Sequence, residues 1–243
     1  MSRASSSLIT RGRTARGEAC VFKRLRPEDS HREDLALRLR NEQQVLTVLA
    51  GTTGVIRLLE VHQHPLSLAL EFADGGSLDQ RLADGSLRED ERLDIARALL
   101  AAVAACHARG VIHRDIKPSN LLFVHGSVVL ADFGVAAWGD PPRAVPQGWE
   151  EDEIGTPPWS APELRHNATD RVDPSVDVYG AAAVIQALLS SARGDPPIIA
   201  GAAAAPSGTK RGPRPNPSEC LAAALSSDPR QRPTLDELAR CFA

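Results

Sequence analysis

The spacing of hydrophobic residues along this chain changes after its first third. Up to that point, short apolar runs alternate with turn-forming residues, which is typical of β-strands. The strands that this pattern predicts are Ser6–Thr10, Ala19–Leu25, Ile56–His62 and Leu66–Phe72. A helix is predicted between the second and third strands, over Asp34–Leu49, because leucines recur there at helical spacing and Gly51 follows as a stop signal.

The remaining two thirds of the chain are predicted to be mainly helical. The helices expected are Asp90–Ala108, Asp177–Leu189, Ser218–Ser226 and Thr234–Phe242. A pair of short strands is expected at Leu121–Val124 and Val128–Ala131. Two segments rich in proline, glycine and alanine, Trp138–Gly148 and Ser190–Pro217, are expected to be loops. A strand-rich part followed by a helix-rich part indicates an α+β fold.

Length and charge limit the class of protein. The chain has 243 residues, enough to bury a substantial core, and a formal net charge of −3. This balance favours neither a nucleic acid nor an anionic membrane as partner. No apolar run approaches the ~20 residues that a membrane-spanning helix needs, and the first residues lack the continuous apolar segment of a signal peptide. We therefore expect a soluble, cytoplasmic protein.

The cysteines are scattered along the chain, and no two of them have Cys-x-x-Cys spacing. They are Cys20, Cys106, Cys220 and Cys241. This distribution disfavours a zinc site or a disulfide framework and agrees with a reducing compartment.

Three motifs follow one another in the middle of the chain. They are VIHRDIKPSNLL at Val111–Leu122, ADFG at Ala131–Gly134 and GTPPWSAPE at Gly155–Glu163. A single His-Arg-Asp is common by chance, but this ordered set is specific. It resembles the motif set of eukaryotic-type serine/threonine protein kinases. The bias toward alanine, arginine and proline favours a bacterial member of that family.

The resemblance covers nearly the whole chain and implies a single protein kinase domain with two lobes. The smaller, β-rich lobe would be residues 1–73, and the larger, helical lobe would be residues 74–243. The implied reaction is transfer of the γ-phosphoryl group of ATP to a serine or threonine hydroxyl of a protein substrate. The implied cofactors are ATP and Mg²⁺, with Mn²⁺ as a possible substitute.

The resemblance assigns the chemistry to residues of the first two motifs. Asp115 would orient the incoming hydroxyl and accept its proton, and Lys117 would offset negative charge on the transferred phosphoryl group. Asn120 and Asp132 would supply the oxygen ligands that Mg²⁺ prefers. Thr156 is expected to line the same cleft, with hydrogen bonds near Asp115 and Lys117.

A lysine is expected to hold the phosphates of ATP, and a glutamate is expected to form an ion pair with it. Lys23, in CVFKRL, resembles the strand lysine that binds the α- and β-phosphates, and Glu42 lies at the separation that the family uses for its ion-pair partner. Taken alone, a lysine in an apolar strand is more simply a side chain that reaches solvent from a sheet edge.

The resemblance places the adenine against the strand and hinge in LSLALEFADGG. The backbone groups of Glu71 and Ala73 would bind the base, and Leu70 would line the rear of its pocket. Val21 and Leu122 would cover the two faces of the base. Both residues could also be ordinary members of the hydrophobic core, and the two roles are compatible.

Other matching residues are expected to shape the site without taking part in the chemistry. Glu163 and Arg232 resemble a buried ion pair that fastens the activation segment, and Asp177 matches the helix residue that holds the catalytic loop.

The sequence departs from the family pattern in two places. The glycine-rich loop that covers the phosphates would fall at or before Met1–Ser7, which contains no glycine, while Gly12 and Gly17 suit a turn between strands. We therefore expect a truncated or degenerate loop: the true start lies upstream of Met1, the first strand is absent, or a segment rich in serine and alanine takes its place. No Ser, Thr or Tyr occurs from Val135 to Gly155, so the segment cannot be activated by phosphorylation there. The acidic run around Asp152 is a candidate anionic partner for Arg114, and a solvated acidic turn is the alternative.

Two other functions are compatible with parts of the sequence. A pseudokinase that binds a nucleotide or a partner would explain the missing glycine-rich loop, but every charged residue of the motif set is present. A small-molecule kinase is disfavoured by APE and DPRQRP, which resemble kinases with protein substrates. A separate sensor or regulatory protein is a further possible partner.

Overall fold

The computed structural model describes residues 7–139, 154–166, 172–191 and 216–243. Its first part is an antiparallel four-stranded sheet with the strand order β1-β2-β4-β3. The strands are β1 (Ser7–Arg13), β2 (Ala19–Leu25), β3 (Leu58–Gln63) and β4 (Leu66–Glu71). All four agree closely with the hydrophobic pattern. Gly17, at φ 83°, makes the turn between β1 and β2, whereas Gly12 pairs with Cys20 inside β1 rather than lying in that turn.

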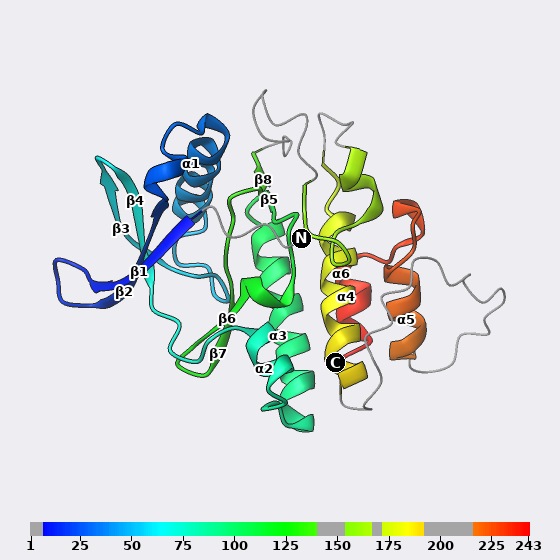
Figure 1. The fold of residues 1–243 in the computed structure, drawn as a ribbon. Helices are drawn as coiled ribbons and strands as arrows, with labels where there is room; N and C mark the ends of the chain where they lie inside the picture. Colours follow the sequence, from blue (N-terminus) through cyan, green and yellow to red (C-terminus); the bar gives the residue numbers. More distant parts are fainter. Residues whose placement is uncertain (1–6, 140–153, 167–171, 192–215) are drawn as a thin grey trace.

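A single helix, α1 (Glu33–Val48), packs against this sheet (Figure 1). Its buried apolar side chains include Leu35, Leu39, Val45 and Leu46, which repeat at helical spacing. The last three belong to the same hydrophobic cluster as Leu68 and Leu70 of β4. Since successive side chains of a strand point to opposite faces, β2 directs Lys23 toward α1 and directs Phe22 and Arg24 away from it.

The second part is helical (Figure 1). Its helices are α2 (Leu78–Ala83), α3 (Glu89–His107), α4 (Ser175–Ser191), α5 (Pro217–Ala224) and α6 (Leu235–Arg240). The middle of α4 is apolar on every side, and its residues 181–185 are wholly buried, as expected of a helix enclosed by others. It packs against α3 and α5.

Two small antiparallel ribbons lie between these parts. β6 (Leu121–Val124) pairs with β7 (Ser127–Leu130), as expected, and β5 (Val111–Ile112) pairs with β8 (Ala137–Trp138). The second ribbon was not predicted, because each of its strands has only two residues and no periodicity to detect. The ribbons fix the two segments that carry the motif residues: one runs from β5 to β6 and the other from β7 to β8.

The α+β, bilobal arrangement is confirmed. The chain leaves the sheet at the end of β4 and enters the helical part at α2, so a boundary at residue 73 stays a prediction. Most of the two expected loops, residues 140–148 and 192–215, lies outside the described residues. No helix in the described ranges combines the length and the apolar character that crossing a bilayer requires.

One expectation about the cysteines, that disulfides are disfavoured, was wrong. Cys220 on α5 and Cys241 at the end of α6 form a disulfide across 21 residues of sequence. Cysteine spacing detects local metal motifs, but it does not reveal that Cys220, inside α5, and Cys241, directly after α6, meet in space. Cys20 and Cys106 are free and buried.

Candidate active site

A buried carboxylate at the start of α4 holds the segment between β5 and β6. The backbone N–H groups of His113 and Arg114 donate to Asp177 Oδ2 and Oδ1, each at 2.8 Å, and His107 Nε2 lies 2.8 Å from Oδ2. Burial alone would raise the pKa of Asp177, but the bonds from His107 and Arg114 lower it. Asp177 therefore stays ionised and fixes the backbone just before Asp115, as the sequence predicted.

A second set of contacts joins the two motif segments. The ring of His113 lies 4.6 Å from the ring of Phe133, and its Nε2 is 2.9 Å from the carbonyl oxygen of Ala131. The N–H of Ala131 in turn donates to the carbonyl oxygen of Asn120 (2.9 Å). Since His113 and Phe133 are fully buried, these contacts set the position of Asp132 relative to Asp115.

Asp115, Lys117 and Thr156 form a closed triangle of hydrogen bonds. Lys117 Nζ donates to Asp115 Oδ2 and to Thr156 Oγ1, both at 2.7 Å, and Thr156 Oγ1 donates to Asp115 Oδ1 at 2.9 Å. The expected place of Thr156 is confirmed. The arrangement presents an ionisable carboxylate beside a cation, which suits positioning a hydroxyl next to a group that gains negative charge.

The amide of Asn120 is oriented by the same carboxylate. Its Nδ2 donates to the backbone oxygen of Asp115 (2.8 Å) and to Asp115 Oδ2 (3.2 Å). The amide oxygen consequently points elsewhere, and no hydrogen bond to it occurs within the described ranges. It is free to act as a ligand of a hard cation.

Lys23 links α1 to the second motif segment. Its Nζ lies 2.7 Å from Glu42 Oε2 and 2.8 Å from Asp132 Oδ1, so the expected ion pair with Glu42 is present. Burial alone would lower the pKa of Lys23, but the charges of Asp132 and Glu42 raise it above its usual value. Burial raises the pKa of Glu42, against the opposing effect of Lys23. A permanently charged ammonium group therefore lies between these two carboxylates.

Asp132 has the properties of a metal ligand. Lys23 holds the pKa of this carboxyl at about 2, and 46% of the side chain is exposed. Its backbone has φ 64°, a left-handed conformation that is strained for a non-glycine residue and often marks functional positions. An exposed, ionised carboxylate together with the free amide oxygen of Asn120 fits a divalent cation. The part of the chain that the structure describes contains no cluster of three or more His, Cys, Asp or Glu side chains suited to a metal.

Some of the residues expected around the adenine lie close to one another in the structure. Val21 and Leu70 lie opposite each other in the β2–β4 register, on the face that carries Lys23. Leu122 is half-buried and bridges to Ser77, just after the hinge. Ala73 is half-buried in the hinge. The Glu71 side chain, for which no role was expected, accepts from the backbone N–H and from Nε of Arg57, both at 2.8 Å.

Two residues near the site were missed. Ile9 pairs with Lys23 in the β1–β2 register, so it lies on the same face of the sheet as Lys23, with 52% of its surface exposed. The alternation of β1, read from that register, would have identified it. Asn41 is buried beside Glu42; its Nδ2 donates to the carbonyl oxygen of Ala136 (2.9 Å), and its Oδ1 accepts from Trp138 Nε1 (3.0 Å). Asn41 could have been identified from the sequence, because a polar residue on the buried side of an amphipathic helix needs hydrogen-bond partners.

Arg114 is a buried cation. It is 2% exposed, and none of its three side-chain nitrogens has a hydrogen-bond partner in the described ranges. Burial lowers its pKa to about 10. A buried guanidinium of this kind favours an anionic neighbour. The acidic run around Asp152, the partner suggested by the sequence, lies outside the described residues.

The expected anchor of the activation segment is present. Arg232 Nη1 and Nη2 donate to Glu163 Oε1 (2.5 Å) and Oε2 (2.8 Å), a bidentate pair. Arg232 also donates to the carbonyl oxygens of Ser175 (3.1 Å) and Ser226 (2.9 Å). The Arg232 side chain is wholly buried.

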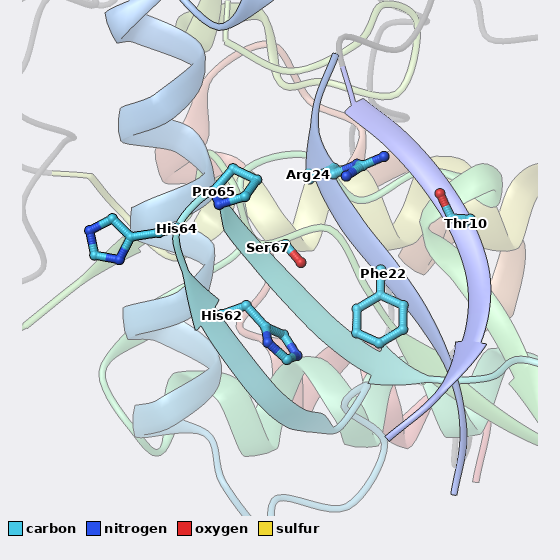
Figure 2. A pocket seen from close by; sticks show the side chains of 7 residues that line it. All are labelled: Thr10, Phe22, Arg24, His62, His64, Pro65 and Ser67. Carbon is cyan, nitrogen blue, oxygen red and sulfur yellow. The ribbon is translucent and has the colours of Figure 1, made fainter. Parts of the chain in front are cut away.

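A separate hollow of about 340 Å³ lies on the opposite face of the sheet (Figure 2). Its lining comes from all four strands and the β3–β4 turn: Thr10, Phe22, Arg24, His62, His64, Pro65 and Ser67. Because Phe22 and Arg24 flank Lys23 in β2, they point away from the cleft. The hollow is therefore distinct from the candidate active site.

The Lys23–Asp132 contact predicts a pH dependence of stability. The pKa of Asp132 is about 2 in the folded protein, against 3.8 without the fold, so its contribution is complete above about pH 5 and is lost as the pH falls toward 2. We expect Asp132→Asn to unfold more easily than wild type at pH 7, by about 1 kcal/mol after allowance for the exposed half of the side chain. The difference should vanish near pH 2, as measured by urea unfolding. The exposed Asp94→Asn serves as control, and a difference that grows at low pH would contradict the assignment.

Comparison with known proteins agrees with this geometry. The model of the protein kinase domain matches residues 4–201. CBL-interacting protein kinase 19 of Oryza sativa subsp. japonica is 36% identical over 151 residues, which cover 61% of this chain and 29% of that protein. CBL-interacting serine/threonine-protein kinase 26 of Arabidopsis thaliana is 35% identical over 155 residues, 62% of this chain and 35% of that protein.

A longer match is found with CBL-interacting serine/threonine-protein kinase 3 of Arabidopsis thaliana, which is 32% identical over 178 residues. These cover 72% of this chain and 40% of that protein. The chain thus spans less than half the length of these three relatives. The family model covers well over half of this chain, and the chain belongs to the protein kinase family.

Proposed function

We propose that this chain transfers the γ-phosphoryl group of ATP to serine or threonine hydroxyls of proteins. The observation that carries the proposal is that two groups of charged and amide side chains lie on segments joined by hydrogen bonds of Ala131 with Asn120 and His113. One group is Asp115 with Lys117 and Asn120, and the other is Asp132 with Lys23 and Glu42. Membership of the protein kinase family and the serine/threonine-protein kinases among the relatives support the same reaction.

Each residue has a distinct part in this reaction. Asp115 accepts a hydrogen bond from the substrate hydroxyl, orients it and takes its proton as the new bond forms. Thr156 and Lys117 hold the Asp115 carboxylate in place, and Lys117 stabilises negative charge on the transferred group. Since the protein carries out little covalent chemistry, most of the rate enhancement comes from positioning and charge.

The nucleotide is held by groups on both sides of the cleft. Lys23, kept in place by Glu42, binds the phosphates, while Val21 and Leu122 cover the faces of the adenine. Leu70 lines the rear of the pocket, and the backbone of Glu71 and Ala73 binds the edge of the base. Asn120 and Asp132 would hold Mg²⁺, or Mn²⁺ in its place, which supplies charge neutralisation on the phosphates when bound.

A pseudokinase is the second candidate, and one observation favours it. Residues 1–7 contain no glycine, although the loop covering the phosphates would fall at or before them. If no other segment fulfils this role, nucleotide affinity is weakened while the charged groups remain. The catalytic proposal is preferred because none of those groups is missing.

Phosphoryl transfer to matched peptides separates the two candidates. With labelled ATP and Mg²⁺, we expect phosphorylation of serine and threonine peptides, none of the tyrosine peptide, and no transfer after chelation of the metal. Mn²⁺ is expected to replace Mg²⁺. If ATP raises the melting temperature but no peptide and no part of the chain itself is labelled, the pseudokinase is the correct assignment.

The buried cation Arg114 leads to a proposal about regulation. One carboxylate of residues 150–153 would act as its permanent counter-charge, in place of a phosphorylated residue. Changing all four residues to glutamine or asparagine should lower kcat about tenfold or more, the size of a lost charge-assisted hydrogen bond of about 1.5–3 kcal/mol. Glu89→Gln with Asp94→Asn is the control. Unchanged activity of the quadruple variant would rule the idea out.

The source, location and partners belong to the same proposal. Composition supports a bacterial source, although the relatives named above are plant proteins. A cytoplasmic location and a protein substrate are part of this proposal. The names of the relatives describe interaction with CBL, which supports, for this chain, a separate regulatory protein. This partner is tested by a pull-down with the purified chain as bait, followed by an assay of the chain's activity with each captured protein. If no captured protein changes the rate of phosphoryl transfer, the proposed regulatory partner is excluded.

A further inference from the structure

A covalent bond joins the last two helices. Cys220 lies on α5 and Cys241 directly follows α6; their Cα atoms are 6.6 Å apart and their sulfurs form a disulfide. Both residues are partly exposed, so small thiols and disulfides in solution can reach them. A disulfide that solvent can reach is open to thiol–disulfide exchange.

The other two cysteines have the opposite character. Cys20 and Cys106 are 1% and 0% exposed, and neither is bonded to another cysteine. Burial raises the pKa of Cys106 to about 12, so its thiolate is scarcely populated at neutral pH. All four cysteines of the chain lie in described ranges. Among them, only Cys220 and Cys241 are both close to another cysteine and accessible to solvent.

The disulfide closes a ring that contains Arg232, the residue that binds Glu163 of the activation segment. Between the two cysteines lie the short turn Pro229–Gln231 and Arg232, the buried residue that holds Glu163. Arg232 also binds the backbone oxygen of Ser175 at the start of α4. The ring therefore contains the contact point between α5–α6 and the activation segment.

The helices that the disulfide joins are short. α5 has 8 residues and α6 has 6, lengths at which helices are unstable in water without tertiary contacts. Their packing relies on a few apolar side chains, chiefly Leu221, Ala224, Leu238 and Phe242. A covalent ring that restricts the unfolded chain adds stability to such an element.

We propose that Cys220 and Cys241 are a reversible redox-modification site whose oxidised state fastens α5, α6 and Arg232 and thereby holds the Glu163 anchor. The co-reactant is a low-molecular-weight disulfide of the glutathione class.

In the oxidising direction, the thiolate of one cysteine attacks this co-reactant, forms a mixed disulfide and releases one small thiol. The second cysteine then attacks the protein sulfur of the mixed disulfide, forms the Cys220–Cys241 bond and releases the second small thiol. The protons of the two cysteines end on the released thiols. Two protein thiols are oxidised while one small disulfide is reduced to two thiols.

Equilibration of the whole chain in buffers of different reduced-to-oxidised glutathione ratio tests the modification. After acid quenching, unfolding and alkylation, we expect two labelled thiols, Cys20 and Cys106, under oxidising conditions and four under reducing conditions. Peptide mapping should join Cys220 to Cys241, and the change should reverse with the ratio. Four labelled thiols at every ratio, or a bond between two chains on a non-reducing gel, would overturn the proposal.

The structural effect is measured on the same samples. We expect the oxidised protein to melt about 6–12 °C higher than the reduced protein, from the loop-closure entropy of a ring of this length. Backbone amides in residues 154–166 and 216–243 should exchange faster in the reduced state, whereas those of the β1–β4 sheet should not change. Equal melting and equal exchange in the two states would refute the role of the bond as a fastener.

Cysteine variants assign the effect. The double variant Cys220→Ser with Cys241→Ser should melt like the reduced wild type and should lose all dependence on the glutathione ratio. Cys20→Ala should keep that dependence. Dependence that persists in the double variant would place the redox-sensitive group elsewhere and contradict the assignment. The readouts are mass, melting and exchange, so they are independent of whether the chain proves to be an active kinase.

Discussion

Replacing Asp115 with asparagine is expected to lower kcat for phosphoryl transfer by about 10²–10⁴-fold, the usual contribution of a positioned general base. Asparagine has nearly the same shape and can still bond to Lys117 and Thr156, so the surrounding triangle of contacts should survive. What is lost is the negative charge that orients the substrate hydroxyl and accepts its proton. The KM for ATP should change little, because Asp115 does not contact Lys23 or Asp132.

The measurement is the initial rate of labelled phosphate incorporation into a serine peptide, with ATP binding followed separately by melting temperature. Asp94→Asn, a carboxylate exposed on α3 and remote from the cleft, is the matched control and should have wild-type activity. A variant Asp115→Asn that transfers phosphate at the wild-type rate would exclude the proposed role of Asp115, and with it the assignment of the reaction to this cleft.

Replacing Glu163 with alanine is expected to destabilise the fold by about 3 kcal/mol, the lower end of the range for breaking a buried ion pair. The Arg232 side chain is fully buried, so its charge would be left without a counter-ion, while 31% of Glu163 is exposed and limits the loss. For a chain of this size the melting temperature should fall by about 6–12 °C. Urea unfolding of both proteins checks the value.

Two further variants show whether the charge is the cause. Glu163→Gln keeps one acceptor oxygen, and with it one of the two hydrogen bonds from Arg232, so it should lose less stability than Glu163→Ala. Combining Glu163→Leu with Arg232→Met removes both charges and should recover part of the loss, since an apolar pair has no unpaired buried charge. If the double variant were less stable than Glu163→Ala, the stabilising effect of Arg232 would lie in its bonds to Ser175 and Ser226 and not in the ion pair.

Local patterns were enough to predict most of the elements. The alternation in β1 to β4 and the helical spacing in α1, α3 and α4 predicted the boundaries of these elements within a few residues. This works because an element that buries one face has apolar residues at the period of that element. The β5–β8 ribbon was missed for the converse reason. Two-residue strands contain no repeat, and their pairing depends on where the segments on either side of them are fixed.

The motifs also identified the chemically important side chains, because the chemistry requires particular residue types at short, fixed separations. Asp115, Lys117 and Asn120 lie within one turn-rich segment, so their proximity follows from the chain itself. The ion pair of Lys23 with Glu42, and the contact of Thr156 with Asp115, were predicted only through the family resemblance. The local sequence alone does not predict that these distant residues are in contact.

The sequence by itself determined the elements, the residue types of the site and their order along the chain. Only the tertiary structure decided which distant groups lie side by side: Asn41 with the backbone after Phe133, Ile9 with Lys23 across the β1–β2 register, and Cys220 with Cys241. The physical reason is that periodicity and spacing record interactions over a few residues, whereas these contacts arise from the packing of whole helices and sheets against one another.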